Sequence, residues 1–166
     1  VAQLAWADAV GFAAMARVSP VLPLIGGGMT KFQPVYVCDV AEAVAKAVDG
    51  DLAPGTVYEL GGPEVKSFKE CMELMLEVIQ RQRLLLPVPF GIASLKAGVL
   101  ERLPGKLLTT DQVRLLKVDN VVSAAAEQAG RTLAGIGVNP SSLAAVLPTY
   151  LDRFRERGQY DAHRLA

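Results

Sequence analysis

The sequence predicts a mixed α/β fold that is rich in helix and has a few short parallel strands. Short β-branched and aromatic segments alternate with longer helix-like segments, which is the pattern of strands joined by helical crossovers. Hydrophobic residues make up 51% of the 166 residues and charged residues 20%, which excludes intrinsic disorder. Three short strands make an incomplete sheet, so we expect the rest of the sheet to come from outside these residues.

The first quarter of the chain predicts two helices around a short strand. Residues 6–17 are rich in alanine and precede Ser19-Pro20, which favours a helix ending there. Residues 21–30 contain Pro and Gly and predict a loop, and residues 34–37 (PVYV) predict a strand. Asp39 is expected to cap the next helix. The apolar side of that helix comprises Val40, Ala41, Val44, Ala45 and Val48.

The middle of the chain predicts two further strands and two helices. Residues 56–60 (TVYEL) form the second predicted strand, which a Gly-Gly-Pro turn ends. Ser67 and Glu70 have the spacing of a capping box, and an apolar helical pattern follows them. Residues 84–87 predict a third strand, and residues 90–103 predict a helix.

The last third predicts two more helices. Thr109 is positioned to cap a helix that runs through Lys117. Pro140 suits the first position of the final helix, and Pro148 is expected to kink that helix by removing one hydrogen bond.

Charge and composition exclude several functions. The chain has 17 basic and 17 acidic residues, so we expect no nucleic-acid partner, which would require a basic face. No apolar run is long enough to predict a membrane-spanning helix. Cys38 and Cys71 are expected to be small core residues. His163 is the single histidine and lies near the end of the sequence, so no metal ligands are predicted.

No catalytic or cofactor-binding set is predicted within the chain. The glycines at 26–28 precede a predicted strand, and those at 61–62 lack the third glycine of a dinucleotide-binding loop. None of the tyrosines is followed by a lysine four residues later. The residues therefore predict an α/β domain that depends on a partner for any chemistry.

Three segments together resemble one family. Residues 32–48 (FQPVYVCDVAEAVAKAV) and 56–75 (TVYELGGPEVKSFKECMELM) are similar to the extended and atypical short-chain dehydrogenases. Within that family, residues 107–123 (LLTTDQVRLLKVDNVVS) also resemble the NAD(P)-binding accessory subunits of respiratory complex I and their bacterial homologues.

The resemblance implies a Rossmann-like fold of which residues 1–166 are the C-terminal, substrate-lobe portion. In this interpretation residues 56–60 add one strand to the main sheet. The glycine-rich dinucleotide-binding half of the family is absent from the sequence and is expected to precede it as a partner. NAD or NADP would then be bound by the full-length protein, and none by this chain alone.

The resemblance also suggests a few substrate-binding residues. Related nucleotide-sugar epimerases place a diphosphate-binding arginine just before the strand, where this chain has Lys31 and Gln33, with Phe32 in the nearest register. A lysine can neutralise a phosphate, and a glutamine can donate or accept a hydrogen bond. Lys31 and Gln33 are therefore candidates, together with Arg114 on a later helix.

Three functions follow from these expectations. The first is the C-terminal part of a complex I subunit in which the nucleotide is structural. The second is the substrate-binding half of an active nucleotide-sugar epimerase, dehydratase or reductase. The third is a non-enzymatic module that docks on a membrane complex. The expected location is cytoplasmic, with peripheral contact at the inner membrane, which in a eukaryote means the matrix side of the mitochondrion.

Overall fold

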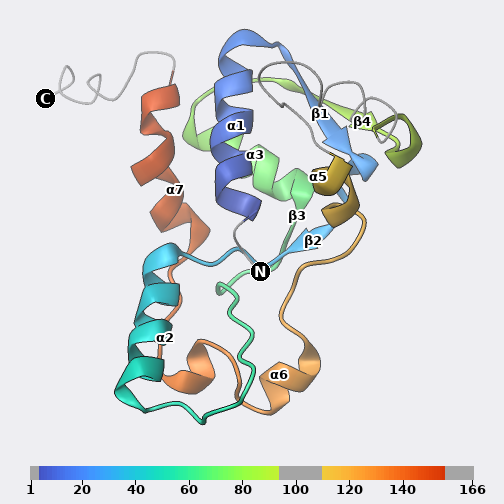
Figure 1. Cartoon of the computed structure of the whole chain (residues 1–166). Coiled ribbons are helices and arrows are strands. Elements are labelled where there is room, and N and C mark those ends of the chain that lie inside the picture. Colours follow the sequence, from blue (N-terminus) through green and yellow to red (C-terminus); the bar gives the residue numbers. More distant parts are fainter. Residues whose placement is uncertain (1–3, 94–109, 156–166) are drawn as a thin grey trace, which may run out of the picture.

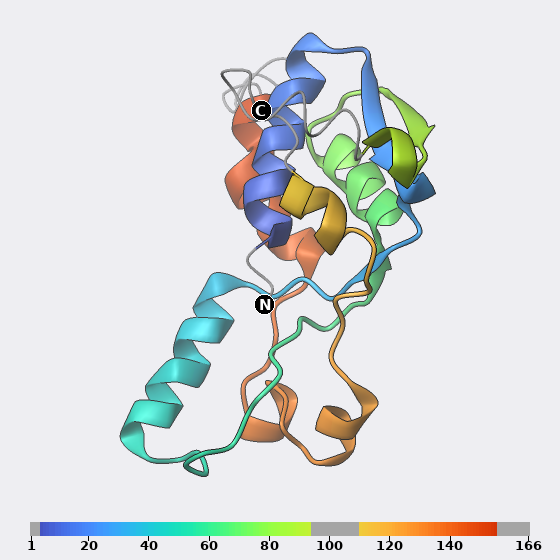
Figure 2. The ribbon, with the colours of Figure 1, turned by 45° about the vertical axis from the view of Figure 1, so that its right-hand side comes forward.

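The computed structural model describes residues 4–93 and 110–155, which form an upper and a lower lobe joined by a neck (Figures 1 and 2). The upper lobe holds the first helix, two parallel strands and the helices packed on them, and the lower lobe holds α2, α6 and the loops between them. The elements, in chain order, are α1 (Leu4–Val18), β1 (Val21–Ile25), η1 (Gly26–Gly28), β2 (Lys31–Phe32), α2 (Val37–Asp49), β3 (Lys66–Ser67), α3 (Phe68–Val78), β4 (Leu84–Val88), α5 (Thr110–Leu115), α6 (Ala124–Gln128), η2 (Ala134–Ile136), α7 (Leu143–Leu151) and η3 (Asp152–Phe154).

The predicted α/β class with short parallel strands is confirmed by the upper lobe. β1 pairs with β4 in parallel, with Val21 opposite Leu84 and Ile25 opposite Val88. The strand predicted at 84–87 is therefore present as β4. The helix predicted at 6–17 is also present, as α1, and its Ala13 and Ala16 are fully buried.

The loop predicted at 21–30 is wrong, because its first half is β1. Leu22 and Leu24 alternate with less buried residues, so the segment has a strand pattern that its proline obscured. Pro23 is tolerated because β1 has one strand neighbour, β4, which leaves an edge where a missing N–H costs little.

The strand predicted at 34–37 is also wrong. The β-structure lies earlier, at β2, which pairs antiparallel with β3, and α2 already begins at Val37. Asp39 is not the helix cap, because Tyr36 occupies that position and Asp39 sits inside the first turn. The Asp39 carboxylate accepts hydrogen bonds from Ser141 instead, a contact across the fold that local spacing could not predict.

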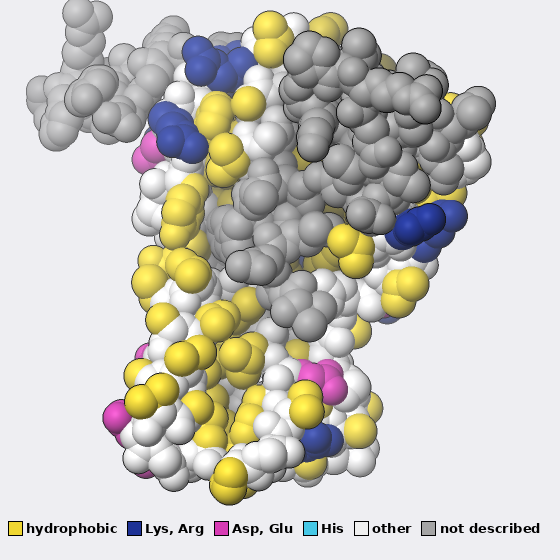
Figure 3. Space-filling model, viewed as in Figure 1, with side chains coloured by type: hydrophobic (Ala, Val, Ile, Leu, Met, Phe, Trp, Pro, Cys, Tyr) yellow, Lys and Arg dark blue, Asp and Glu magenta, His cyan; other side chains and the backbone are white. Residues whose placement is uncertain are grey.

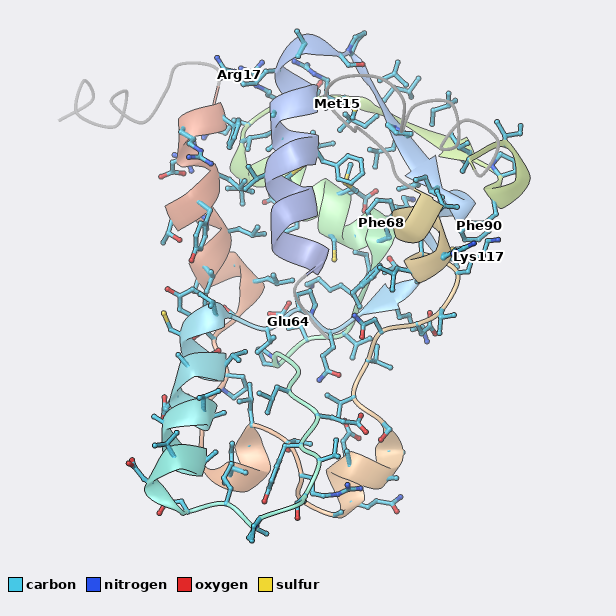
Figure 4. The ribbon with its side chains drawn as sticks, viewed as in Figure 1. Met15, Arg17, Glu64, Phe68, Phe90 and Lys117 are labelled. Carbon is cyan, nitrogen blue, oxygen red and sulfur yellow. The ribbon has the colours of Figure 1, made fainter. Side chains whose placement is uncertain are left out.

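The predicted capping box before α3 is confirmed. The Ser67 hydroxyl accepts from the Glu70 N–H, and the Glu70 carboxylate accepts from the Ser67 N–H at 2.7 Å. The apolar face of α3 packs into the upper core. There Phe68, which Figure 4 labels, meets the rings of Phe12 and Phe32 edge-on. The ring centroids are 5.6 and 6.3 Å apart.

The strand predicted at 56–60 is not formed within the chain. The Glu59 N–H donates to the Arg131 carbonyl at 3.0 Å, but no ladder of hydrogen bonds continues from it among the described residues. A strand needs a neighbour along its length, and the lower lobe supplies none there. The addition of this segment to a larger sheet stays a prediction.

The final third of the chain follows the predictions in part. α5 ends at Leu115, so Lys117 lies beyond it, and Thr109 and His163 lie outside the described residues. Residues 90–93 are helical, and the rest of the helix predicted at 90–103 is also outside them. The last helix is capped by Ser142 rather than begun by Pro140, and Pro148 lies inside it as expected.

The two lobes differ greatly in the size of their cores. Among the described residues, eighteen buried hydrophobic side chains form the upper core, including Leu22, Met75 and Leu151. The lower core has four, which are Val35, Ala43, Leu133 and Val138. Because burial of apolar area is the main favourable term in folding, we infer that the upper lobe supplies most of the stability.

Three arginine side chains donate hydrogen bonds to carbonyls at the ends of helices in the upper lobe. The Nε of Arg83 donates to the Ala16 carbonyl at the end of α1, and the Nε of Arg155 donates to the Val78 carbonyl at the end of α3. Arg81 donates in the same way to Phe154. These guanidinium groups satisfy carbonyls that have no partner within their helices, and the positive charges complement the helix dipoles.

Gly62 lies where two chain segments cross in the neck. A Cβ atom at this position would lie 1.9 Å from the Pro34 carbonyl oxygen, so only glycine fits without a shift of the backbone. We predict that Gly62→Ala lowers the free energy of unfolding by roughly 1–3 kcal/mol, the range seen for overpacked sites. Chemical denaturation monitored by circular dichroism measures it.

Gly91→Ala is the matched control for this experiment, because a Cβ there meets nothing within 4 Å. We expect that control to be neutral or slightly stabilising. Equal stability of the Gly62→Ala and Gly91→Ala variants would contradict the close crossing.

Candidate functional site

The predicted residue Gln33 lies in the neck, where its amide joins three segments of the chain. Its Nε2 donates to the Gly62 carbonyl at 2.9 Å, and its Oε1 accepts from the Val122 N–H at 2.9 Å. Its backbone N–H donates to the Asn120 carbonyl at 3.0 Å. Both polar atoms of this side chain are therefore engaged inside the protein, and in this structure Gln33 positions the neck.

Lys31 lies two residues away on β2, with an exposed side chain. Its backbone N–H donates to Asp119 Oδ1 at 2.8 Å, and its carbonyl accepts from the Asn120 N–H at the same distance. These bonds fix the backbone at Lys31 and leave the long side chain at the surface beside the neck. Its charge could serve a phosphate or carboxylate, as the sequence suggests.

Arg114 is exposed on α5, the helix that leads into the same neck. A hydrogen bond from the Thr30 hydroxyl, just before β2, to the Leu116 carbonyl, just after α5, joins these two parts of the chain. Lys117 lies 5.9 Å from the centre of the Phe90 ring, a cation–π contact visible in Figure 4. The structure thus places all three predicted residues on elements around one end of the upper lobe.

Asp39 is the most buried charged side chain described, at 6% exposure. It accepts from the Ser141 N–H at 2.7 Å and from the Ser141 hydroxyl at 3.0 Å. Both donors come from the segment that leads into α7, so this contact joins α2 to the last crossing of the neck. A carboxylate with these two donors has a structural role in this arrangement.

Glu59 binds the capping residue of α6, a helix that the sequence did not predict. Its carboxylate accepts from the Ser123 N–H at 2.7 Å and from the Ser123 hydroxyl at 2.9 Å, and Ser123 in turn caps α6. These hydrogen bonds hold the pKa of Glu59 below its ordinary value. The signal was the spacing of Ser123 before an alanine-rich run, but the partner Glu59 lies 64 residues away.

Tyr36 and Cys71 both have pKa values that oppose a catalytic role near neutral pH. Hydrogen bonding to Cys38, with the nearby charge of Cys38 and Tyr150, raises the pKa of Tyr36 to about 12. Burial raises the pKa of the Cys71 thiol to about 11. A tyrosine base or a cysteine nucleophile needs the opposite shift, toward the working pH.

The described part of the chain assembles neither a metal centre nor a transmembrane helix. Within residues 4–93 and 110–155, no three His, Cys, Asp or Glu side chains come together in a way that could hold a metal ion. In the same ranges no helix is long and apolar enough to cross a bilayer. What the neck does offer is the exposed cation of Lys31, whose backbone is held by hydrogen bonds to Asp119 and Asn120.

The hydrogen bonds from Ser123 to the Glu59 carboxylate make the stability of the lower lobe sensitive to acid. Because the pKa of Glu59 is lowered on folding, its contribution to stability is complete above the ordinary glutamate value of 4.5 and is lost as the pH falls below it. We predict that Glu59→Gln lowers the melting temperature at pH 7. The difference from the unmodified chain should shrink as the pH falls below 4.5.

Thermal melts at a series of pH values measure this difference, with Glu42→Gln on the exposed side of α2 as the control. We expect the control to melt like the unmodified chain at every pH. A difference in melting temperature between Glu59→Gln and the unmodified chain that stays constant from neutral to acid pH would contradict the role given to the Glu59–Ser123 hydrogen bonds.

Comparison with known proteins identifies two that are similar to this chain in sequence. The sequence matches no protein-family model. It is 40% identical over 112 residues to NADH dehydrogenase [ubiquinone] 1 alpha subcomplex subunit 9, mitochondrial, of Arabidopsis thaliana, a match covering 61% of this chain and 28% of the relative. It is 28% identical over 136 residues to the mitochondrial NADH-ubiquinone oxidoreductase 40 kDa subunit of Neurospora crassa, covering 81% of this chain and 35% of the relative.

Comparison with solved structures supplies the fold. The crystal structure of NADPH-dependent quinone oxidoreductase from Escherichia coli, complexed with NADPH, aligns with a TM-score of 0.63 and 17% identity. The alignment covers 86% of this chain and 49% of that one. The predicted resemblance is therefore confirmed, and the chain has the fold of about half of an NADPH-binding oxidoreductase. It spans about a third of the length of the curated relatives it matches.

Proposed function

We propose that this chain is the C-terminal, substrate-lobe portion of an NAD(P)-binding accessory subunit of respiratory complex I. The observation that carries the proposal is the 40% identity to the Arabidopsis NADH dehydrogenase subunit over 112 residues. The match to the Neurospora subunit over 81% of the chain supports it. The fold shared with a quinone oxidoreductase is consistent with a parent that holds a nucleotide.

In this proposal the chain contributes a lobe, and the nucleotide is held by another part of the parent. The glycines at 26–28 follow β1, but they lead into β2 rather than into the helix whose N-terminus would bind a pyrophosphate. Lys31, Gln33 and Arg114 would lie on the side of this lobe that meets the substrate, with the exposed Lys31 as the group best placed to meet an anion. The nucleotide then supports the fold of the parent rather than turnover.

An active nucleotide-sugar epimerase or reductase half is the less favoured function. The position where related epimerases hold diphosphate is occupied by Phe32, which is buried in the upper core and faces Phe68. The Gln33 amide, the next polar group, makes its hydrogen bonds within the neck. Neither side chain is presented as a diphosphate ligand.

A peripheral membrane contact fits one surface of the upper lobe. Val18, Leu84 and Leu86 are 88%, 64% and 50% exposed. They lie together because the Leu84 N–H donates to the Pro20 carbonyl and Leu86 pairs with β1. Arg17 and Arg83 flank them, and apolar side chains beside arginines are the composition of surfaces that rest on anionic lipid headgroups.

The proposal is tested by tagging the gene at its own locus and purifying the protein from mildly solubilised membranes. We expect recovery with an assembly that has NADH:ubiquinone oxidoreductase activity on a native gel, in stoichiometric amount with the other subunits by mass spectrometry. An alkaline carbonate wash should release the protein if its membrane contact is peripheral. Recovery in a separate fraction without that activity would contradict the proposal.

We also predict that the 166-residue chain alone binds neither NADH nor NADPH. The chain has no glycine-rich strand–turn–helix unit to hold the pyrophosphate. Titration of the purified chain, followed by nicotinamide fluorescence, measures this. Saturable binding with a dissociation constant in the micromolar range would place the nucleotide site within the chain and overturn this part of the proposal.

A further inference from the structure

The helix α2 turns its apolar side toward solvent. Val37, Ala41, Val44 and Val48 recur at intervals of four, three and four residues, which places them on one side of a helix. The three valines are 59%, 56% and 81% exposed, and Ala41 is exposed as well. Together with Ala45 these residues are called the α2 apolar face. Figure 3 shows hydrophobic side chains exposed on the lower lobe, where α2 lies.

The opposite side of α2, which packs on the lower lobe, is less apolar. Its buried residues are Asp39 and Ala43, and of the described residues of α2 only Ala43 is a buried member of the small lower core, with Val40 partly buried against it. A surface helix of a complete domain ordinarily buries its apolar stripe and exposes its charges. In α2 the three valines of the apolar face are exposed instead, so no described part of the chain covers this face.

The lower lobe has two further signs of a missing partner. Its core holds four buried hydrophobic residues among those described, far fewer than a self-supporting domain needs. Its extended segment at residues 56–60 has no ladder partner there, and Val57 within it is 70% exposed. An extended segment without a strand neighbour and a helix with exposed valines, both in one lobe, are what remains when a layered α/β structure is divided.

We propose that the α2 apolar face is the docking surface for the remaining part of the parent α/β fold, the part that the longer relatives carry beyond their match to this chain. This inference rests on the proposed function and names the surface involved. The matches cover 28% and 35% of the curated relatives, and the aligned oxidoreductase accommodates this chain in 49% of one continuous polypeptide. Enough of the parent therefore lies outside this chain to cover the lobe.

The side chains of the α2 apolar face indicate what kind of segment would pack on it. Valine and alanine side chains form a shallow aliphatic surface, which suits close packing against the face of a sheet or another helix. Glu42 and Asp49, seven residues apart and both exposed, lie together along one flank of the face. The docking segment is accordingly aliphatic at its centre and basic along the matching edge.

The test uses the 166-residue chain co-expressed with a separately encoded part of the Arabidopsis relative, namely the residues that precede its match. We expect the two polypeptides to be recovered as a 1:1 complex. The double variant Val44→Asp and Val48→Asp should bind at least about tenfold more weakly, because docking would bury two unpaired charges. Its melting temperature as a free chain should be unchanged, because both valines are exposed there.

Val118→Asp is the matched control, since Val118 is 69% exposed but lies outside α2. The control should bind like the unmodified chain. Equal binding by the double variant, or an equal loss with Val118→Asp, would overturn the inference. So would a concentration-dependent dimer of the chain alone that the double variant abolishes, because a second copy would then be the occupant.

Failure of the unmodified chain to bind the Arabidopsis segment would also overturn the inference. It would leave the proposed function to be judged separately, by recovery of the tagged protein with the NADH:ubiquinone oxidoreductase activity. The two failures are therefore distinguishable.

Discussion

The structure depends on how four passages of the chain are held together in the neck (Figure 2). The Gln33 amide binds the passage through Gly62 and the passage through Val122, and the Asp39 carboxylate binds Ser141 on the last passage. These two side chains connect every segment that runs between the lobes. Because the lower core is small, this polar network, rather than buried apolar area, fixes the position of the lower lobe.

The same constraint limits what chemistry the neck can perform. A side chain that positions backbone atoms on both sides is not available to reorganise around a ligand, and Gln33 is such a side chain. Lys31 is different, because only its backbone is engaged and its side chain is exposed. The neck thus combines a hydrogen-bonded backbone with the exposed charge of Lys31, which suits a lobe that borders a site more than one that contains the reacting groups.

Local signals in the sequence predicted local structure well, and long-range contacts explain the failures. The Ser67–Glu70 capping box acts within four residues, and it is present as predicted. Asp39 looked like a cap in sequence but binds Ser141, which is 102 residues away. Of the site, the sequence could indicate Lys31 as an exposed cation. The structural use of Gln33 could not be predicted, because its partners come from residues 62 and 122.

The helix α2 shows that an amphipathic pattern can reflect packing against parts of the complete fold that lie outside these 166 residues. Its sequence predicts a helix with one apolar side, and the helix is present. Most of that side faces solvent, however, and only Val40 among its predicted members packs on the lower core. The helical period of α2 is as predicted, but its exposed valines point away from the lobe. Turning the helix by half a turn would bury these valines, so their exposure needs a cause. Asp39 prevents that turn, because its bonds to Ser141 fix the helix with its apolar face outward. The polar contact that holds the lower lobe together therefore also keeps its docking surface exposed and ready for a partner.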